Sequence, residues 1–210
     1  MFFTIEEEKL EEEIVEKKSK FIAHLYYVTN EEEAQDILQK VKKQYYDARH
    51  NCFAYRVMTE SGVVERFSDD GEPSGTAGGP MLNILAKNNL CNVVVVVTRY
   101  FGGMLLGTGG LVRAYSDATV KVIDTATLAN ETFGLEVEVT IDYNELELLK
   151  YYCKNNNISI VNTVYENNIK CYIEVTNEEL NDLLDNNKSN CNILNHTIIE
   201  QKNIRKRVNS

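Results

Sequence analysis

The sequence predicts an α/β (α+β) protein with two domains, residues 1–132 and 133–210. Apolar residues make up 43% and charged residues 26% of the chain, which is the composition of a globular protein. Strand and helix patterns alternate along its whole length. A chain of 210 residues can form one large domain or two small ones, and a change in composition along the chain favours two. Glycine becomes rare and asparagine abundant after residues 130–134, which predicts a domain boundary there.

The first half contains two predicted helices and three predicted strands. Residues 30–46 have helical periodicity and begin with Asn30 and Glu33 at capping-box spacing. Two strand-like runs, 51–58 and 63–67, flank Ser61 and Gly62 in the manner of a hairpin. The run VVVVVTRYF at 93–101 does not alternate, so it predicts a central strand buried on both faces. Glycine-rich residues 102–110 then lead into a helix with Leu111, Tyr115, Ala118 and Val122 on one face.

The second half has the element order βαββαβ, which predicts a ferredoxin-like domain. The predicted strands are 134–143, 158–166, 169–175 and 196–201. The first helix, 144–154, begins with a predicted capping box of Asn144 and Glu147, and the second, 178–187, is introduced by Thr176 and Glu179. Asn167 and Asn168 predict a two-residue turn. The basic end of the chain, residues 202–207, is expected to be a solvated terminus.

Charge and cysteine usage exclude several classes of protein. The formal charge of −10 disfavours a general coat for duplex DNA. The longest apolar run has five residues, whereas a membrane-spanning helix needs about 20. The start, MFFTIEEEKLEEE, has acidic residues where a targeting signal needs basic ones, so we expect a cytoplasmic protein. Five cysteines without a CxxC pair indicate reduced thiols.

Three segments hold nearly all the unusual composition: DARHNCFAYR at 47–56, FSDDGEPSGTAGGPML at 67–82 and VVVTRYFGGMLLGTGGLVRAY at 95–115. The last two contain the SDDGEPxGTAGxP and RYFGGxxLGxGGLVRAY patterns, at residues 68–80 and 99–115. In these motifs the chain resembles the IMPACT/YigZ family over residues 18–128. One departure is Ala48, where the family often has Ser or Thr ahead of the histidine.

The resemblance implies a fold and a kind of function. It implies an N-terminal domain similar to elongation factor G domain IV and to the GHMP kinases. It also implies a ferredoxin-like C-terminal domain similar to elongation factor G domain V. Eukaryotic IMPACT is associated with restraining a starvation-sensing kinase pathway by competing for its activator. By analogy, a translation-linked regulatory role is expected for this chain.

The glycines and carboxylates each leave two interpretations open. Glycines between a buried strand and a helix can turn backbone N–H groups toward an anion. They can equally allow tight packing that excludes a Cβ atom. The carboxylates of Asp69, Asp70 and Glu72 can hold Mg²⁺, or they can cap a turn and pair with an arginine.

The basic residues near these motifs are open to two interpretations as well. Arg99 and Tyr100 end the central strand, where they can contact a ligand or form structural contacts with the acidic turn. Arg113 is expected to pair with Asp117 at i+4. His50 and Cys52 share one side of a strand, but apolar neighbours favour an inert thiol.

These residues favour a binding protein over an enzyme. The leading hypothesis is a cytoplasmic regulator that contacts RNA, the ribosome or a regulatory protein. The alternative is a Mg²⁺-dependent phosphotransferase or phosphohydrolase in which the glycine turns cradle phosphate. We expect no catalytic residue, metal ligand, cofactor or membrane partner. The predicted binding residues are Arg49, His50, Asp69, Asp70, Glu72, Arg99, Tyr100, Gly102, Gly103, Gly109, Gly110 and Arg113.

Overall fold

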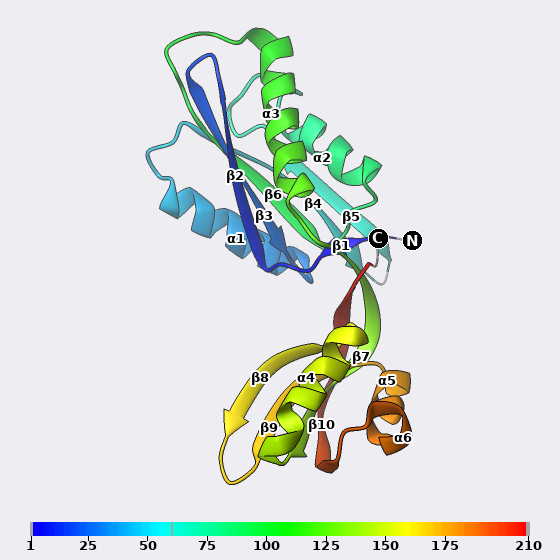
Figure 1. The fold of residues 1–210 in the computed structure, drawn as a ribbon. Coiled ribbons are helices and arrows are strands. Elements are labelled where there is room, and N and C mark those ends of the chain that lie inside the picture. Colours follow the sequence, from blue (N-terminus) through cyan, green and yellow to red (C-terminus); the bar gives the residue numbers. More distant parts are fainter. Residues whose placement is uncertain (1, 60, 209–210) are drawn as a thin grey trace. The chain divides into compact units, whose positions relative to one another are not determined.

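The computed structural model describes residues 2–59 and 61–208 and divides into two compact units, residues 1–129 and 130–210 (Figure 1). The predicted division at residues 132/133 lies close to this one. Strands and helices alternate in both units, so the protein is of the mixed α/β class expected from the sequence.

The N-terminal unit is built on a five-stranded antiparallel sheet in the order β2-β3-β6-β4-β5. The short strand β1 lies outside that sheet and pairs with the first residues of β7 (Leu128–Ile141). The elements are β1 (Thr4–Ile5), β2 (Lys9–Glu16), β3 (Ser19–Tyr27), α1 (Glu31–Gln44), β4 (His50–Thr59), β5 (Gly62–Ser68), α2 (Gly78–Lys87), β6 (Val93–Tyr100) and α3 (Gly107–Asp124).

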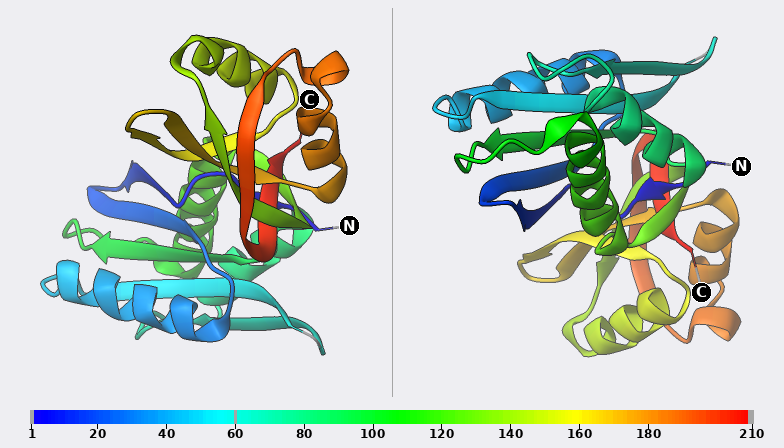
Figure 2. Two further views of the ribbon diagram at one scale, coloured as in Figure 1. Left: turned by 90° about the horizontal axis from the view of Figure 1, so that it is seen from below. Right: turned by 90° about the horizontal axis from the view of Figure 1, so that it is seen from above.

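Strand β6 is the central strand, as its unbroken apolar sequence predicts. Val93, Val95 and Val97 face the core beneath α2 and α3. Val94 and Val96 face the opposite core, which contains the buried side of α1. Two further views show the helices on both faces of this sheet (Figure 2). Alternation is absent from the sequence because both sides of the strand are buried.

Helix α1 begins where its capping residues predict. The side chain of Asn30 accepts a hydrogen bond from the Glu33 N–H at 2.8 Å. The Glu33 carboxylate accepts from the N–H of Thr29, not from that of Asn30, so the reciprocal half of the capping box is displaced by one residue. The helix buries Ala34, Leu38 and Val41.

Helix α3 begins four residues earlier than the apolar pattern predicts. It starts at Gly107, so Gly109 and Gly110 lie inside its first turn. The hydrophobic face was predicted correctly: Leu111, Tyr115, Ala118 and Val122 are buried. The expected pairing of Arg113 with Asp117 is not formed, since the described residues include no ion pair between these exposed side chains.

The C-terminal unit has the predicted ferredoxin-like order βαββαβ. Its strands have the order β10-β7-β9-β8 within a sheet that β1 extends to five strands, and its helices pack on one hydrophobic core. The elements are β7 (Leu128–Ile141), η1 (Tyr143–Glu145), α4 (Leu146–Asn155), β8 (Ser159–Tyr165), β9 (Ile169–Val175), α5 (Asn177–Leu184), α6 (Asn186–Ser189) and β10 (Ile193–Arg207). Thr176 and Glu179 form the predicted capping box of α5.

Two local predictions in this unit are wrong. Asn144 does not cap a helix, because a 3₁₀ turn covers it and α4 begins at Leu146 without a side-chain cap. The turn between β8 and β9 has three residues, 166–168, closed by the Glu166 N–H donating to the Asn168 carbonyl at 3.1 Å. Neither Asn167 nor Asn168 takes a positive φ.

The expected solvated end of the chain is instead part of a strand. β10 extends to Arg207. Lys202 pairs with Glu136 and Glu174, and Lys206 pairs with Glu179 at 2.8 Å. The lysines form these ion pairs because acidic residues of β7, β9 and α5 lie opposite them. Those residues are distant in sequence, so the local sequence does not reveal the pairing.

All five cysteines are free, as their odd number and spacing predicted, and all five are buried. In the part of the chain that the structure describes, no helix is long and apolar enough to span a membrane.

Candidate functional site

A cavity of about 450 Å³ lies in the N-terminal unit, where three segments far apart in sequence meet. They are the start of β4, the acidic turn after β5, and the chain from the end of β6 into α3. The cavity is lined by Arg49, His50, Gly71, Glu72, Pro73, Arg99, Phe101, Leu105, Leu106, Gly107, Thr108 and Leu111. Four of the predicted binding residues, Arg49, His50, Glu72 and Arg99, are therefore brought together.

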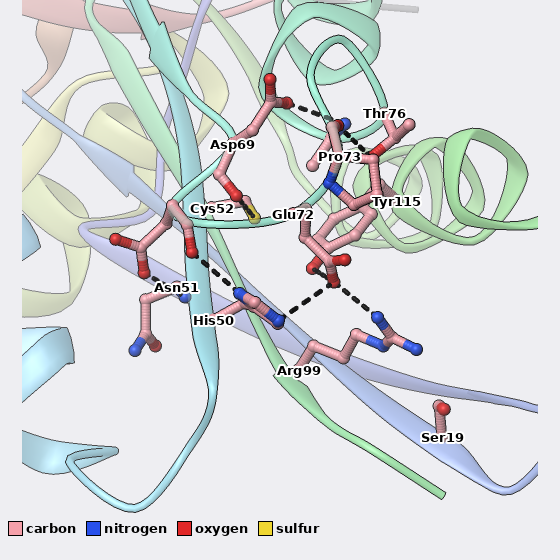
Figure 3. A network of polar contacts seen from close by, with 12 residues as sticks. Ser19, His50, Asn51, Cys52, Asp69, Glu72, Pro73, Thr76, Arg99 and Tyr115 are labelled. Carbon is pink, nitrogen blue, oxygen red and sulfur yellow. Dashed lines mark hydrogen bonds and ion pairs between the residues drawn. The ribbon is translucent and has the colours of Figure 1, made fainter. Parts of the chain in front are cut away.

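The ion pair of Glu72 with Arg99 is the buried polar centre of this site (Figure 3). An Nη atom of Arg99 donates to Glu72 Oε1 at 2.6 Å, and the two residues are 6% and 8% exposed. The Tyr115 hydroxyl donates to the same carboxylate oxygen at 2.8 Å. The structural interpretation of Arg99, a salt bridge to the acidic turn, is correct, and the same residue also lines the cavity.

His50 connects this ion pair to the acidic turn. Its Nδ1 lies 2.8 Å from the Asp70 carbonyl oxygen. Because a carbonyl only accepts hydrogen bonds, Nδ1 carries a proton and donates it. The other ring nitrogen, Nε2, lies 3.9 Å from Glu72 Oε1. One side of the histidine is thus held by the backbone, and the other faces the carboxylate in the cavity wall (Figure 3).

Asp69 and Asp70 organise the turn and are not arranged as metal ligands. Asp69 Oδ1 accepts from the N–H groups of Ala77 and Gly78, at 3.0 and 2.9 Å, at the start of α2. Asp70 Oδ2 accepts from the Asn51 N–H at 2.7 Å, and its Oδ1 pairs with Lys42 at 2.8 Å. Residues 2–59 and 61–208 contain no cluster of three or more acidic, His or Cys side chains able to hold a metal ion. The turn-capping interpretation accounts for these carboxylates.

The N-terminus of α3 opens onto the cavity. Gly107 and Thr108 line the cavity and are the first two residues of this 18-residue helix. No side chain caps the helix, and its first turn has no acidic residue. The first N–H groups of an α-helix have no acceptor inside the helix, so this end carries unsatisfied donors and partial positive charge.

The other predicted binding residues lie outside the cavity lining. Gly102 packs against the backbone of Lys18 and Ser19, where a Cβ would overlap the Lys18 carbonyl group. The Tyr100 hydroxyl donates to Asp47 at 2.8 Å, and this hydrogen bond raises the pKa of Tyr100 to about 12. The remaining residues that do not line the cavity are Asp69, Asp70, Gly103, Gly109, Gly110 and Arg113.

Sequence reasoning missed the apolar wall of the cavity. Leu106 and Leu111 are buried, whereas Phe101 and Leu105 are 47% and 85% exposed. The one signal in the sequence is that the apolar residues at 101, 105 and 106 stand among glycines. Their placement beside the arginines depends on the positive φ of Gly103 and Gly107, +83° and +71°, which bends the chain between β6 and α3.

Cys52 lies beneath the acidic turn and is expected to be chemically inert. Its thiol donates to the Asp69 carbonyl oxygen at 2.9 Å. Burial raises the pKa of the Cys52 thiol to about 12, from 9.0. Near pH 8 this leaves about a thousandfold less thiolate than an unperturbed cysteine has, and the thiolate is the nucleophile.

We therefore expect iodoacetamide to label Cys52 in the native protein at least about a hundredfold more slowly than a free thiol at pH 8. Site-resolved mass spectrometry measures the rate, and the same protein in denaturant provides the control. Labelling at the rate of a free thiol would show that Cys52 is activated or exposed.

Comparison with known proteins shows similarity over most of the chain. Residues 17–123 match the Impact N-terminal domain, and residues 139–185 match a domain of unknown function. The chain is 39% identical over 180 residues to "IMPACT family member YvyE" of Bacillus subtilis, covering 86% of this chain and 82% of that protein. It is 36% identical over 151 residues to "IMPACT family member YigZ" of Escherichia coli, covering 71% and 74%.

The two-domain architecture also has a solved counterpart. A crystal structure described as that of a hypothetical protein matches with a TM-score of 0.60 and 28% identity, over 95% of this chain and 97% of the other.

Proposed function

Since the chain belongs to the IMPACT family, we propose that it is a cytoplasmic regulatory protein of translation that binds RNA of the ribosome through the cavity face of its N-terminal domain. The translation link comes from the family resemblance, in which both domains are similar to domains of elongation factor G. The choice of RNA comes from the chemistry of the cavity. A regulatory protein partner is the other candidate occupant of the same face.

One observation carries the proposal: positive groups converge on one cavity of an acidic chain. Arg49 and Arg99 line it together with the uncapped end of α3. The chain as a whole carries a formal charge of −10. A polyanion is attracted to this face and repelled elsewhere, so it can approach in few orientations. That favours a structured RNA groove over duplex coating.

The contacts of Asp69 and Asp70 argue against the alternative, a Mg²⁺-dependent phosphotransferase. Both carboxylates already accept hydrogen bonds from backbone N–H groups, and Asp70 also pairs with Lys42. A metal at this turn would have to displace these donors and uncap the start of α2. Binding without chemistry therefore fits the geometry better.

Ribosome cosedimentation tests the proposal. We expect wild-type protein to pellet with ribosomes at low salt, and Arg49→Glu to weaken binding about tenfold and reduce the salt slope by about 1. Arg49 is exposed and forms no ion pair in the described part of the chain, so its reversal leaves the fold intact.

The matched control is Arg113→Glu, an equal charge change at an exposed position of α3 outside the cavity. It should alter binding less than about twofold. Absence of binding by the wild type at low salt, or equal loss in both variants, would contradict the RNA proposal. Binding that survives nuclease treatment of the ribosomes would show that the cavity face binds a protein partner and not RNA.

A further inference from the structure

We propose that the cavity of the N-terminal domain is a binding site for a single nucleoside phosphomonoester, with its phosphate at the N-terminus of α3 and its base against Phe101. This inference rests on the proposed function, which makes the cavity a binding site, and it specifies the chemical group that the cavity recognises. The ligand is either a free mononucleotide or the phosphorylated end of an RNA strand. Both ligands present the same nucleoside phosphomonoester to the cavity.

The phosphate position follows from the start of α3. The N–H groups of Gly107, Thr108 and Gly109 precede the first intrahelical hydrogen bond and have no side-chain cap. The Thr108 hydroxyl adds a further donor at the cavity wall. Glycine at 107 and 109 leaves the backbone open, and a Cβ at either position would meet no atom within 4 Å. An anion can therefore approach the helix end closely.

Arg99 supplies an independent observation that points to an anion. Its side chain is 8% exposed and lines the cavity, yet its Nε atom has no hydrogen-bond partner in the described residues. An unsatisfied buried donor is destabilising, and water does not reach this one. A small rotation of the guanidinium toward a phosphate oxygen would satisfy it, and arginine donors match phosphate geometry.

The charges around the cavity leave room for an anion. Glu72 is the acidic side chain in the lining, and its Oε1 already accepts from Arg99 and Tyr115. Arg49 remains as a second, exposed guanidinium without an ion pair among residues 2–59 and 61–208. Two arginines and a helix N-terminus against one carboxylate leave net positive potential for a phosphomonoester.

The size and the apolar wall of the cavity indicate a nucleoside attached to that phosphate. A volume of about 450 Å³ is much larger than inorganic phosphate requires and lies in the range of small-molecule sites. The half-exposed ring of Phe101 and the exposed side chain of Leu105 line the same cavity. Aromatic side chains stack on bases irrespective of base identity. We expect affinity for the nucleotide class with little discrimination among bases.

Calorimetric titration of the full chain with defined probes tests the inference. The probes are AMP, adenosine, and an oligoribonucleotide with either a 5′-phosphate or a 5′-hydroxyl. The inference predicts that AMP or the 5′-phosphorylated strand binds at least about tenfold more tightly than its phosphate-free counterpart. Binding of AMP identifies the free mononucleotide as sufficient, whereas binding of the phosphorylated strand alone identifies an RNA end.

Thr108→Asp separates binding from folding. A carboxylate in the first turn of a helix stabilises it, so the melting temperature should stay the same or rise. The same carboxylate occupies the anion position, so phosphate-dependent affinity should fall about tenfold or more. Arg113→Glu, on the same helix but outside the cavity, should change the affinity less than about twofold.

The inference would be overturned if AMP bound no more tightly than adenosine and the 5′-phosphorylated strand no more tightly than the 5′-hydroxyl strand. Absence of binding at millimolar ligand, or an unchanged affinity in Thr108→Asp, would also overturn it. These results are distinguishable from failure of the proposed function. A protein that pellets with ribosomes but shows no phosphate-dependent binding contradicts only this inference. A protein that binds AMP but not ribosomes contradicts only the translation role.

Discussion

Replacing Glu72 with alanine should lower the free energy of unfolding of the N-terminal domain by about 3–5 kcal/mol. The substitution leaves the Arg99 guanidinium buried without its counterion. It also removes the acceptor of the buried Tyr115 hydroxyl. Removing one partner of a buried pair is strongly destabilising because the other charge remains desolvated. Urea unfolding, followed by the signal of the N-terminal domain, measures the change.

The matched control is Glu13→Ala, which breaks a Lys–Glu pair in the same sheet. Glu13 is exposed and its partner Lys20 is half-exposed, with 44% and 43% of their side chains accessible. This control should cost about 1 kcal/mol or less. Replacing Glu72 and Arg99 together by methionine should cost less than Glu72→Ala, since no uncompensated charge is left. Equal losses in Glu72→Ala and Glu13→Ala would show that the buried pair is not the centre of this domain.

Substituting Gly102 by alanine should destabilise the N-terminal domain by about 3 kcal/mol. The added Cβ would overlap the backbone carbonyl group of Lys18 and the N–H of Ser19. The Gly102 N–H also donates to the Ser19 hydroxyl at 3.1 Å, so the two segments cannot separate without losing that bond. Backbone atoms of a strand end cannot move aside as a flexible side chain can. Thermal unfolding monitored by circular dichroism measures the loss.

Gly109→Ala is the opposite control in the same glycine-rich segment. Gly109 lies in α3, and a Cβ there meets no atom within 4 Å. Alanine at such a helical position should stabilise by about 0.5–1 kcal/mol. If Gly102→Ala were neutral, or if both substitutions shifted stability in the same direction, the close packing of Gly102 on β3 would be wrong.

Much of the fold follows from local sequence patterns. The unbroken valine run of β6, the apolar faces of α1 and α3 and the capping box of α5 each depend on residues a few positions apart. Such patterns fail where distant groups decide the outcome. Asn144 has the spacing of a cap but lies in a 3₁₀ turn. The basic chain end becomes part of β10, which pairs with β7, and its lysines meet acidic residues of other elements.

The sequence by itself determined the family, the two α/β units and the residue types of the site, because these are properties of composition, periodicity and ordered motifs. It could not decide between the two interpretations of each glycine, carboxylate and arginine. Only the tertiary structure assigned Gly102 to packing and Asp69 to capping, and seated Arg99 against Glu72 at the wall of a cavity. The reason is physical: whether a charge is paired or free depends on groups that folding brings within about 4 Å, whatever their separation in sequence.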